Sequence, residues 1–194
     1  MQDCSLSAQE IACRRGDRIL FRGVNLSLSG GAALHITAAN GVGKSSLMRI
    51  LAGLLLPFNG AVSTKGAIGL LDERPALDPQ TSLAGALRFW GEVDGCDNPQ
   101  ELALLLGVEE LLDVPFRYLS TGQRKRAAFI RLLNQAPPIW LLDEPLNGLD
   151  RDARDRITSL VRLHCEDGGI CVIASHQPID LPEIMPFDLE GFVQ

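Results

Sequence analysis

The stretch Ala32-Ala33-Leu34-His35-Ile36-Thr37, followed at once by Asn40-Gly41-Val42-Gly43-Lys44-Ser45-Ser46, decides the fold. Its first part is a short apolar run typical of a β-strand. Its second part matches the phosphate-loop pattern G-x-x-x-x-G-K-[ST], except that Ala38 occupies the first glycine position. Residues 45–53 then carry apolar side chains at helical spacing. The order strand, glycine-rich loop and helix predicts a nucleotide-binding loop.

The chemistry of such a loop explains its residue types. Glycines let backbone N–H groups wrap a phosphate chain, and the N-terminus of the following helix favours anions. We expect the loop from Asn40 to Ser46 to bind ATP, Lys44 to contact the β- and γ-phosphates, and Ser45 to ligate Mg²⁺. The alternative is a glycine turn before an ordinary helix. Ala38 is either tolerated as a small residue or narrows the loop and weakens nucleotide binding.

The bulk composition indicates a globular protein that does not act generally on nucleic acids. The chain has 194 residues, 46% hydrophobic residues and a net charge of −6. Five cysteines without CxxC spacing are typical of reduced cytosolic thiols. We expect no signal peptide. The uncharged stretch 24–43 contains too many polar residues and glycines for a membrane span, so we expect membrane association only through a partner.

Alternating strands and helices predict the fold class. Strands are expected at 19–28, 32–37, 67–71, 139–142 and 170–174, and helices at 45–53, 82–91, 99–106, 121–135 and 152–165. This order predicts an α/β P-loop NTPase with a mainly parallel sheet. The turn-rich region of about 72–118 is expected to be a helical subdomain inserted into one domain, whose core is about 1–71 and 119–194.

Two carboxylates end the apolar run Pro138-Ile139-Trp140-Leu141-Leu142. The carboxyl edge of a parallel sheet is where α/β proteins bind ligands. We therefore expect Asp143 to join the Mg²⁺ shell and Glu144 to orient and deprotonate the attacking water. The alternative is an ordinary strand end with solvated acids, but a phosphate loop upstream favours the catalytic interpretation.

A further motif carries a resemblance to a known family. The run Leu119-Ser120-Thr121-Gly122-Gln123 resembles the LSGGQ signature of ABC-type ATPases, with Thr121 in place of the first glycine. The chain is similar to the nucleotide-binding subunits of ABC transporters over nearly its whole length. That resemblance implies an N-terminal antiparallel β portion, a dimer that sandwiches ATP, and contacts from Ser120, Gly122 and Gln123 to the partner's nucleotide. The alternative for Ser120 is a plain cap of a helix with a basic face.

The same resemblance assigns two later positions. Leu149-Asp150 resembles the D-loop that couples the two protomers, and His176 falls where the family has its switch histidine, which contacts the γ-phosphate. The resemblance thus adds His176 to Glu144 in the catalytic set. A histidine after a strand is otherwise more often structural.

The chain departs from the family pattern after the expected strand at 67–71. The family carries a glutamine there, whereas Arg74 occupies that place and Gln80 is the nearest glutamine. The aromatic residue that stacks on adenine is also missing, which leaves Arg14, Arg15 and Phe21 as candidates.

A narrower resemblance concerns the transported substrate. The segments 14–21, 119–126, 140–145 and 175–178 look like those of the haem-exporter ATP-binding subunits of bacterial cytochrome c maturation. This implies a peripheral ATPase on the cytoplasmic face of the inner membrane, docked on integral-membrane permease subunits. The resemblance ties its cycle to haem delivery to the periplasm, either by export or by release of a haem-loaded carrier, so that haem is involved only indirectly. The residues themselves leave open an ABC subunit for another substrate, a soluble ABC ATPase acting on nucleic acid or ribosomes, and a weakly active nucleotide-binding regulator.

Overall fold

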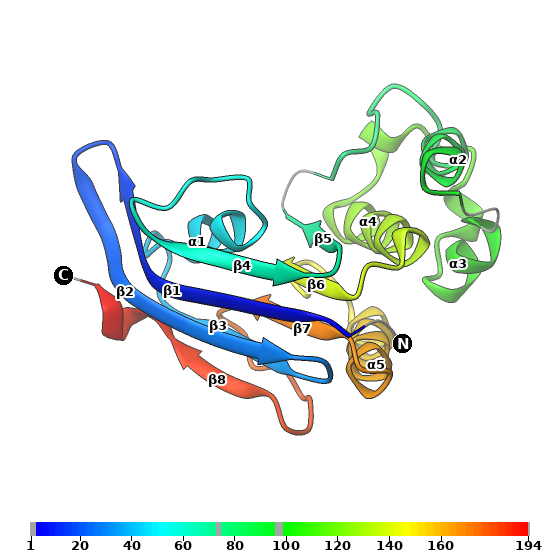
Figure 1. Cartoon of the computed structure of the whole chain (residues 1–194). Coiled ribbons are helices and arrows are strands. Elements are labelled where there is room, and N and C mark those ends of the chain that lie inside the picture. Colours follow the sequence, from blue (N-terminus) through cyan, green and yellow to red (C-terminus); the bar gives the residue numbers. More distant parts are fainter. Residues whose placement is uncertain (1–2, 73–74, 96–98, 194) are drawn as a thin grey trace.

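An antiparallel sheet forms the N-terminal layer. The computed structural model describes residues 3–72, 75–95 and 99–193 (Figure 1). Strands β1 (Ser5–Arg15), β2 (Arg18–Ser29) and β4 (Asn59–Lys65) pair antiparallel in the order β2-β1-β4. Gly16, with a left-handed φ of 57°, makes the tight turn between β1 and β2. The predicted strand at 19–28 is β2. The sequence patterns do not predict β1 and β4 as individual strands.

A five-stranded parallel sheet lies at the centre. Its strands are β3 (Ala33–Thr37), β5 (Ile68–Leu71), β6 (Ile139–Asp143), β7 (Ile170–Ala174) and β8 (Met185–Asp188), in the order β5-β6-β7-β3-β8. Every residue of β6 and β7 is buried, as expected for central strands covered on both faces. The edge strand β8 is mostly exposed and lacks such an apolar run, which explains why its sequence did not predict it.

The helices start and end close to the predicted positions. They are α1 (Lys44–Leu51), α2 (Leu83–Asp94), α3 (Pro99–Leu105), α4 (Thr121–Gln135) and α5 (Arg151–Glu166). Short 3₁₀ turns follow at Glu109–Leu111, Phe116–Tyr118 and Leu189–Phe192. Side-chain oxygens of Ser82, Ser120 and Asp150 accept backbone hydrogen bonds at the starts of α2, α4 and α5.

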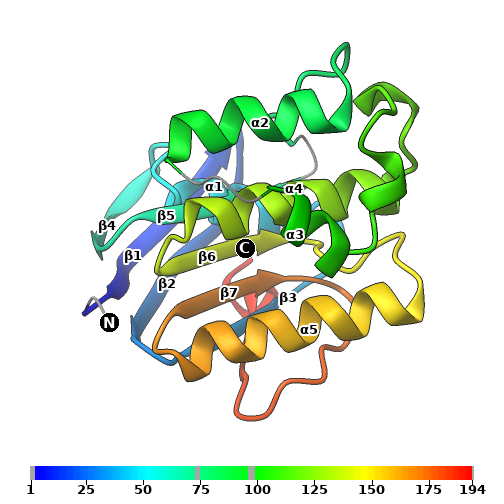
Figure 2. The ribbon, with the colours of Figure 1, turned by 90° about the vertical axis from the view of Figure 1, so that its right-hand side faces the viewer.

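The apolar residues form two cores, one on each face of the parallel sheet. One core joins α1 and the antiparallel sheet to the strands, and the other joins α4 and α5 to the opposite face (Figures 1 and 2). The helices α2 and α3 lie on the outer side of α4 (Figure 2). The α/β fold with an antiparallel sheet and a parallel sheet core is confirmed. The assignment of about 72–118 as an inserted helical subdomain stays a prediction.

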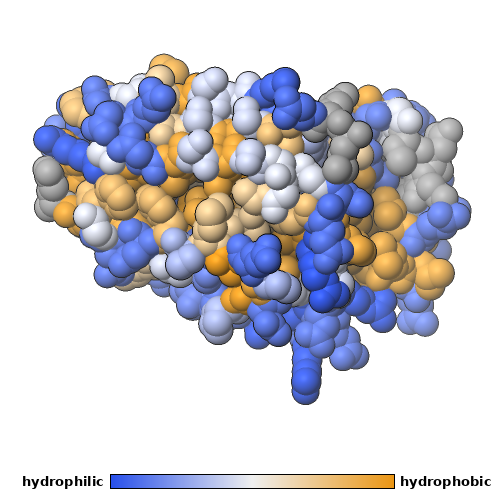
Figure 3. All heavy atoms as spheres, turned by 60° about the horizontal axis from the view of Figure 1, so that its bottom comes forward, coloured by the Kyte–Doolittle hydropathy of each residue, from blue (hydrophilic) through white to orange (hydrophobic). Residues whose placement is uncertain are grey.

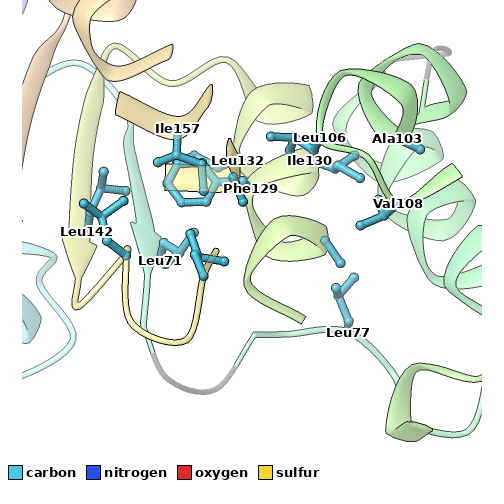
Figure 4. Packing of buried hydrophobic residues seen from close by; sticks show 14 of the residues in the cluster. Leu71, Leu77, Ala103, Leu106, Val108, Phe129, Ile130, Leu132, Leu142 and Ile157 are labelled. Carbon is cyan, nitrogen blue, oxygen red and sulfur yellow. The ribbon is translucent and has the colours of Figure 1, made fainter. Parts of the chain in front are cut away.

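Helix α4 connects the parallel sheet to the outer helices. Phe129 of α4 is fully buried and lies among Leu142, Leu71 and Ile157 (Figure 4). On the other side of α4, the guanidinium of Arg131 lies 3.6 Å from the ring centroid of Trp90 in α2. Arg126 donates to the carbonyl oxygens of residues 106 and 107, just after α3.

The outer surface mixes charged and apolar residues. The face in Figure 3, the underside of Figure 1, shows apolar patches separated by hydrophilic side chains. Within the described part of the chain, no helix combines the length and the apolar character needed to cross a bilayer.

Replacing Phe129 by alanine tests the role of α4 in the core. Phe129→Ala should lower the free energy of unfolding by about 3–5 kcal/mol, because it leaves a cavity where α4 meets the sheet. The matched control is Phe89→Ala, at a phenylalanine of α2 that is 58% exposed, and it should cost less than about 1 kcal/mol. Urea denaturation of both variants measures the difference. Equal losses would contradict this description of the core.

Candidate active site

The phosphate loop lies between β3 and α1 and is open to solvent. Gly41 and Gly43 adopt left-handed φ angles of 83° and 123°. Gly43 is also the N-cap of α1, and no side chain caps that end of the helix. The first N–H groups of α1 are therefore not used by a capping side chain, in contrast to those of α4 and α5.

The backbone of the loop explains why glycine is required at position 43 but not at position 38. A Cβ on Gly43 would lie 3.0 Å from the buried ring of Phe21, and the φ of Gly43 disfavours other residues. Ala38 is not among the residues with a positive φ, so a methyl group is compatible with its backbone. Its carbonyl accepts a hydrogen bond of 2.7 Å from Lys44 Nζ. The loop backbone therefore does not require glycine at this position.

The register of three parallel strands brings the candidate residues to one edge. Ile36 of β3 pairs with Ala174 of β7, and Ala174 pairs with Asp143 of β6. The phosphate loop, residues 175–176 and Glu144 therefore all leave the sheet at the same level. Backbone bonds extend this alignment, since the Ser175 N–H donates to the Ile36 carbonyl at 3.1 Å and the Glu144 N–H to the Ala174 carbonyl at 2.8 Å.

Glu144 is the centre of the charged cluster. Its carboxylate oxygens lie 3.0 and 3.1 Å from His176 Nδ1, and Oε1 lies 3.9 Å from Lys44 Nζ. Lys44 is 6% exposed, whereas the His176 side chain is about half exposed. The structure thus brings together Glu144, His176 and Lys44, which are far apart in the sequence. This group can hold a charged phosphate chain beside a base.

Asp143 and Ser45 provide oxygen atoms next to this cluster. Asp143 ends β6 and is 4% exposed, while Ser45 is exposed in the first turn of α1. A carboxylate and a hydroxyl are hard oxygen donors that suit Mg²⁺, which takes few protein ligands and completes its shell with phosphate oxygens and water. The donor set therefore fits a magnesium–nucleotide complex.

Beside this edge, His35 lies under the loop that follows β7. Its Nε2 is 3.2 Å from the Ser175 carbonyl. Partial burial lowers the pKa of His35, although the bond to Ser175 and the charge of Glu144 act in the opposite direction. His35 is therefore suited to a structural role in its neutral form.

The signature residues form a capped helix start away from the phosphate loop. The Gln123 N–H donates to Ser120 Oγ at 3.3 Å, and the Ser120 N–H donates to Gln123 Oε1 at 2.8 Å, which makes a capping box. No hydrogen bond or ion pair found within the described ranges joins Ser120, Gly122 or Gln123 to residues 38–46 of the same chain. Thr121 is the first residue of α4, where a helical backbone does not require glycine.

Gly122 lies against the loop before α5. A Cβ on Gly122 would lie 2.5 Å from the Gly148 carbonyl oxygen, so the two backbones approach more closely than any other residue would allow. Two residues later, Asp150 Oδ1 accepts a 2.8 Å bond from the Ala153 N–H and caps α5. The segment that resembles the D-loop and the segment that resembles the signature are therefore neighbours.

The candidates for the missing glutamine and for the adenine-stacking residue have different outcomes. Arg74 lies outside the described residues, and the side chain of Gln80 accepts a hydrogen bond from Arg117. Phe21 was wrong as an adenine-stacking candidate, because its fully buried ring packs under Gly43. The Arg14 guanidinium lies 4.7 Å from the ring centroid of Phe58, and Arg15 is exposed.

The sequence interpretation missed a carboxylate from the end of the chain. Glu190 Oε1 accepts a hydrogen bond of 2.7 Å from the Ala39 N–H in the phosphate loop. Glu190 lies 151 residues from its partner, in the 3₁₀ turn after β8. No local pattern marks such a contact, because it depends on the position of β8 beside β3.

Comparisons with known proteins agree with this geometry. Residues 21–147 match the family model described as ABC transporter. The chain is 53% identical to the "Cytochrome c biogenesis ATP-binding export protein CcmA" of Novosphingobium aromaticivorans, over 99% of both chains. It is 42% identical to the protein of the same description from Zymomonas mobilis, over 97% of this chain and 86% of the relative.

The chain belongs to the ABC transporter family. It is an ABC-type ATP-binding ATPase subunit that resembles cytochrome c biogenesis ATP-binding export proteins.

Solved ABC structures show the same fold. A putative ABC transporter ATP-binding protein from Pyrococcus furiosus matches with a TM-score of 0.82 at 19% identity, over 98% of this chain and 100% of that chain. The cbiO1 structure from Clostridium perfringens, described as part of the ABC transporter complex cbiONQ, matches with a TM-score of 0.76 at 26% identity, over 100% of this chain and 88% of that chain.

Gly122→Ala tests the close approach of the two loops in this ABC ATPase. The added methyl group must displace the Gly148 backbone, so we expect a loss of about 1–3 kcal/mol in the free energy of unfolding and a fall in ATP hydrolysis. Thr121→Ala, at the neighbouring exposed position, should change neither by much. Urea denaturation and a steady-state ATPase assay measure both effects. A Gly122→Ala protein as stable as the wild type would contradict the proposed backbone contact.

Proposed function

We propose that two copies of this chain bind two ATP molecules between them and hydrolyse ATP with Mg²⁺ to drive a membrane permease in cytochrome c biogenesis. The observation that carries the proposal is the cluster of Glu144, His176 and Lys44 beside an open phosphate loop. The strong similarity to cytochrome c biogenesis export proteins supports the choice of pathway.

Each residue has a role that its position supports. The N–H groups of the loop Asn40–Ser46 and of the first turn of α1 hold the phosphates, and Lys44 neutralises their charge. Ser45 and Asp143 would hold Mg²⁺, which would neutralise the charge that develops on the transferred phosphoryl group. Glu144 orients the attacking water and accepts its proton, and His176 holds the Glu144 carboxylate and reaches the γ-phosphate.

The signature acts on the nucleotide of the other copy. In one chain, Ser120, Gly122 and Gln123 lie at the start of α4 and not at the phosphate loop. The N-terminus of α4 carries a partial positive charge and is suited to a γ-phosphate presented by a second copy. The capping box fixes this helix end before the copies meet.

The permease would dock on the side of the molecule where α4 meets β5. A cavity of about 280 Å³ is lined there by residues that include Leu54, Leu70, Asp72 and Arg131. Leu54, which lines this cavity, is exposed together with Leu56 and Phe58, and grouped exposed apolar side chains typically mark interaction sites. We place the complex on the cytoplasmic face of the inner membrane and propose that the helical segment at about 72–118 transmits the motion. Haem would be served only indirectly, through the membrane partner.

Trapping the dimer tests the composite site. Glu144→Gln should bind ATP without hydrolysing it and should shift to the mass of a dimer with Mg²⁺ and ATP, because the proton acceptor is lost and the phosphate contacts remain. Lys44→Ala is the control that weakens phosphate binding and should stay monomeric. Size-exclusion chromatography with light scattering measures the mass. A monomeric Glu144→Gln protein at saturating Mg²⁺ and ATP would count against the sandwich.

Genetic complementation tests the pathway. The test uses a bacterial strain that lacks its cytochrome c biogenesis ATP-binding protein. This strain should recover c-type cytochromes when it expresses the wild-type chain together with the membrane partners from the same source as the chain. Lys44→Ala, expressed at the same level, should not restore them, since ATP binding is impaired. Haem staining of c-type cytochromes is the readout. If active wild-type ATPase fails to complement, the chain serves another substrate.

A further inference from the structure

Glu144 adopts a backbone conformation that residues with a side chain disfavour. Its φ angle is 48°, in the left-handed region. Such a conformation is unfavourable for an L-residue and persists only where neighbouring groups hold it. The residue that the proposed function uses as a base is thus held by contacts outside its own side chain.

Both peptide groups of Glu144 have partners. Its N–H donates to the Ala174 carbonyl at the end of β7, at 2.8 Å. Its carbonyl accepts a hydrogen bond from Lys125 Nζ, which comes from α4. The left-handed turn is therefore fixed on one side by the parallel sheet and on the other by the helix that begins with the signature.

The direction of the carboxylate follows from this backbone. From the turn at Glu144, the side chain extends toward the phosphate loop and reaches His176 and Lys44. A rotation of the Glu144 peptide would move the carboxylate oxygens away from the place of the attacking water. Displacements of about 1 Å at a reacting group can reduce rates by about a hundredfold.

The surroundings of Lys125 leave room for such a rotation. Lys125 and Glu144 line a cavity of about 450 Å³ together with Asp72, Thr121 and Asn147. A shortened side chain at 125 would leave the Glu144 carbonyl facing this space. Lys125 is also half-buried, unlike a lysine on a solvated helix face.

We infer that Lys125 is a positioning residue for ATP hydrolysis: it holds the Glu144 carbonyl so that the Glu144 carboxylate faces the phosphate loop. The inference rests on the proposed function of Glu144. In this role, Lys125 does not contact the nucleotide. The hydrogen bond from Lys125 also links α4, which would contact the partner's ATP, to Glu144, the base that acts on the chain's own ATP.

A kinetic comparison of three variants tests the inference. Lys125→Met keeps most of the aliphatic stem and removes the donor, so kcat should fall at least about tenfold while KM for ATP stays within about twofold. Lys125→Arg keeps a cationic donor and should recover a large part of kcat. The control is Arg126→Met, which removes a positive charge from the same helix. Arg126 donates to the Leu106 and Gly107 carbonyls and not to Glu144, so the kcat of this variant should stay within about twofold of wild type.

A second measurement separates positioning from damage to the fold. Adding Lys125→Met to Glu144→Gln should cause no further loss of the residual rate and should leave the ATP-bound dimer intact, because the base is already absent. A wild-type kcat in Lys125→Met, or an equal loss in Arg126→Met, would overturn the inference. Continued hydrolysis in Lys44→Ala would instead overturn the proposed function itself.

Discussion

The parallel pairing of β3, β7 and β6 is the constraint on which the site depends. One register places Ile36, Ala174 and Asp143 side by side, so three loops leave the sheet at the same level. The loops carry different chemistry: backbone N–H groups and Lys44 after β3, His176 after β7, and Glu144 after β6. A shift of one residue in any of these pairs would turn every side chain of a strand to the opposite face. The buried strands exclude that shift, because both faces are packed.

The sequence predicted most of this arrangement because its decisive features are local. The buried strand segments 139–142 and 170–174 are continuous apolar runs, and the phosphate loop has a fixed spacing. The expected helix 121–135 matches the observed bounds of α4, and the structure adds that Ser120 and Gln123 form a capping box at its start. The edge strand β8 was not predicted, because an exposed strand of four residues carries little periodicity.

The parts that the sequence could not supply are contacts between distant segments. The bond from Lys125 to the Glu144 carbonyl depends on how α4 lies across the sheet, and the bond from Ala39 to Glu190 depends on β8. Each of these bonds has a backbone group as one partner. Because every residue type carries a backbone carbonyl, and nearly every one an N–H, no sequence pattern marks such a partner. The rejection of Phe21 as a stacking residue has a similar origin, since only the packing shows that its ring is under Gly43.

The contact between Gly122 and Gly148 has a mechanical meaning. The start of α4 and the loop before α5 approach closely at Gly122 and Gly148, with the side chains of Thr121 and Leu149 beside the contact. Because the two backbones leave no space between them, these segments form one rim, and a displacement of one must displace the other. A second copy that presses on this rim would move both helix starts together.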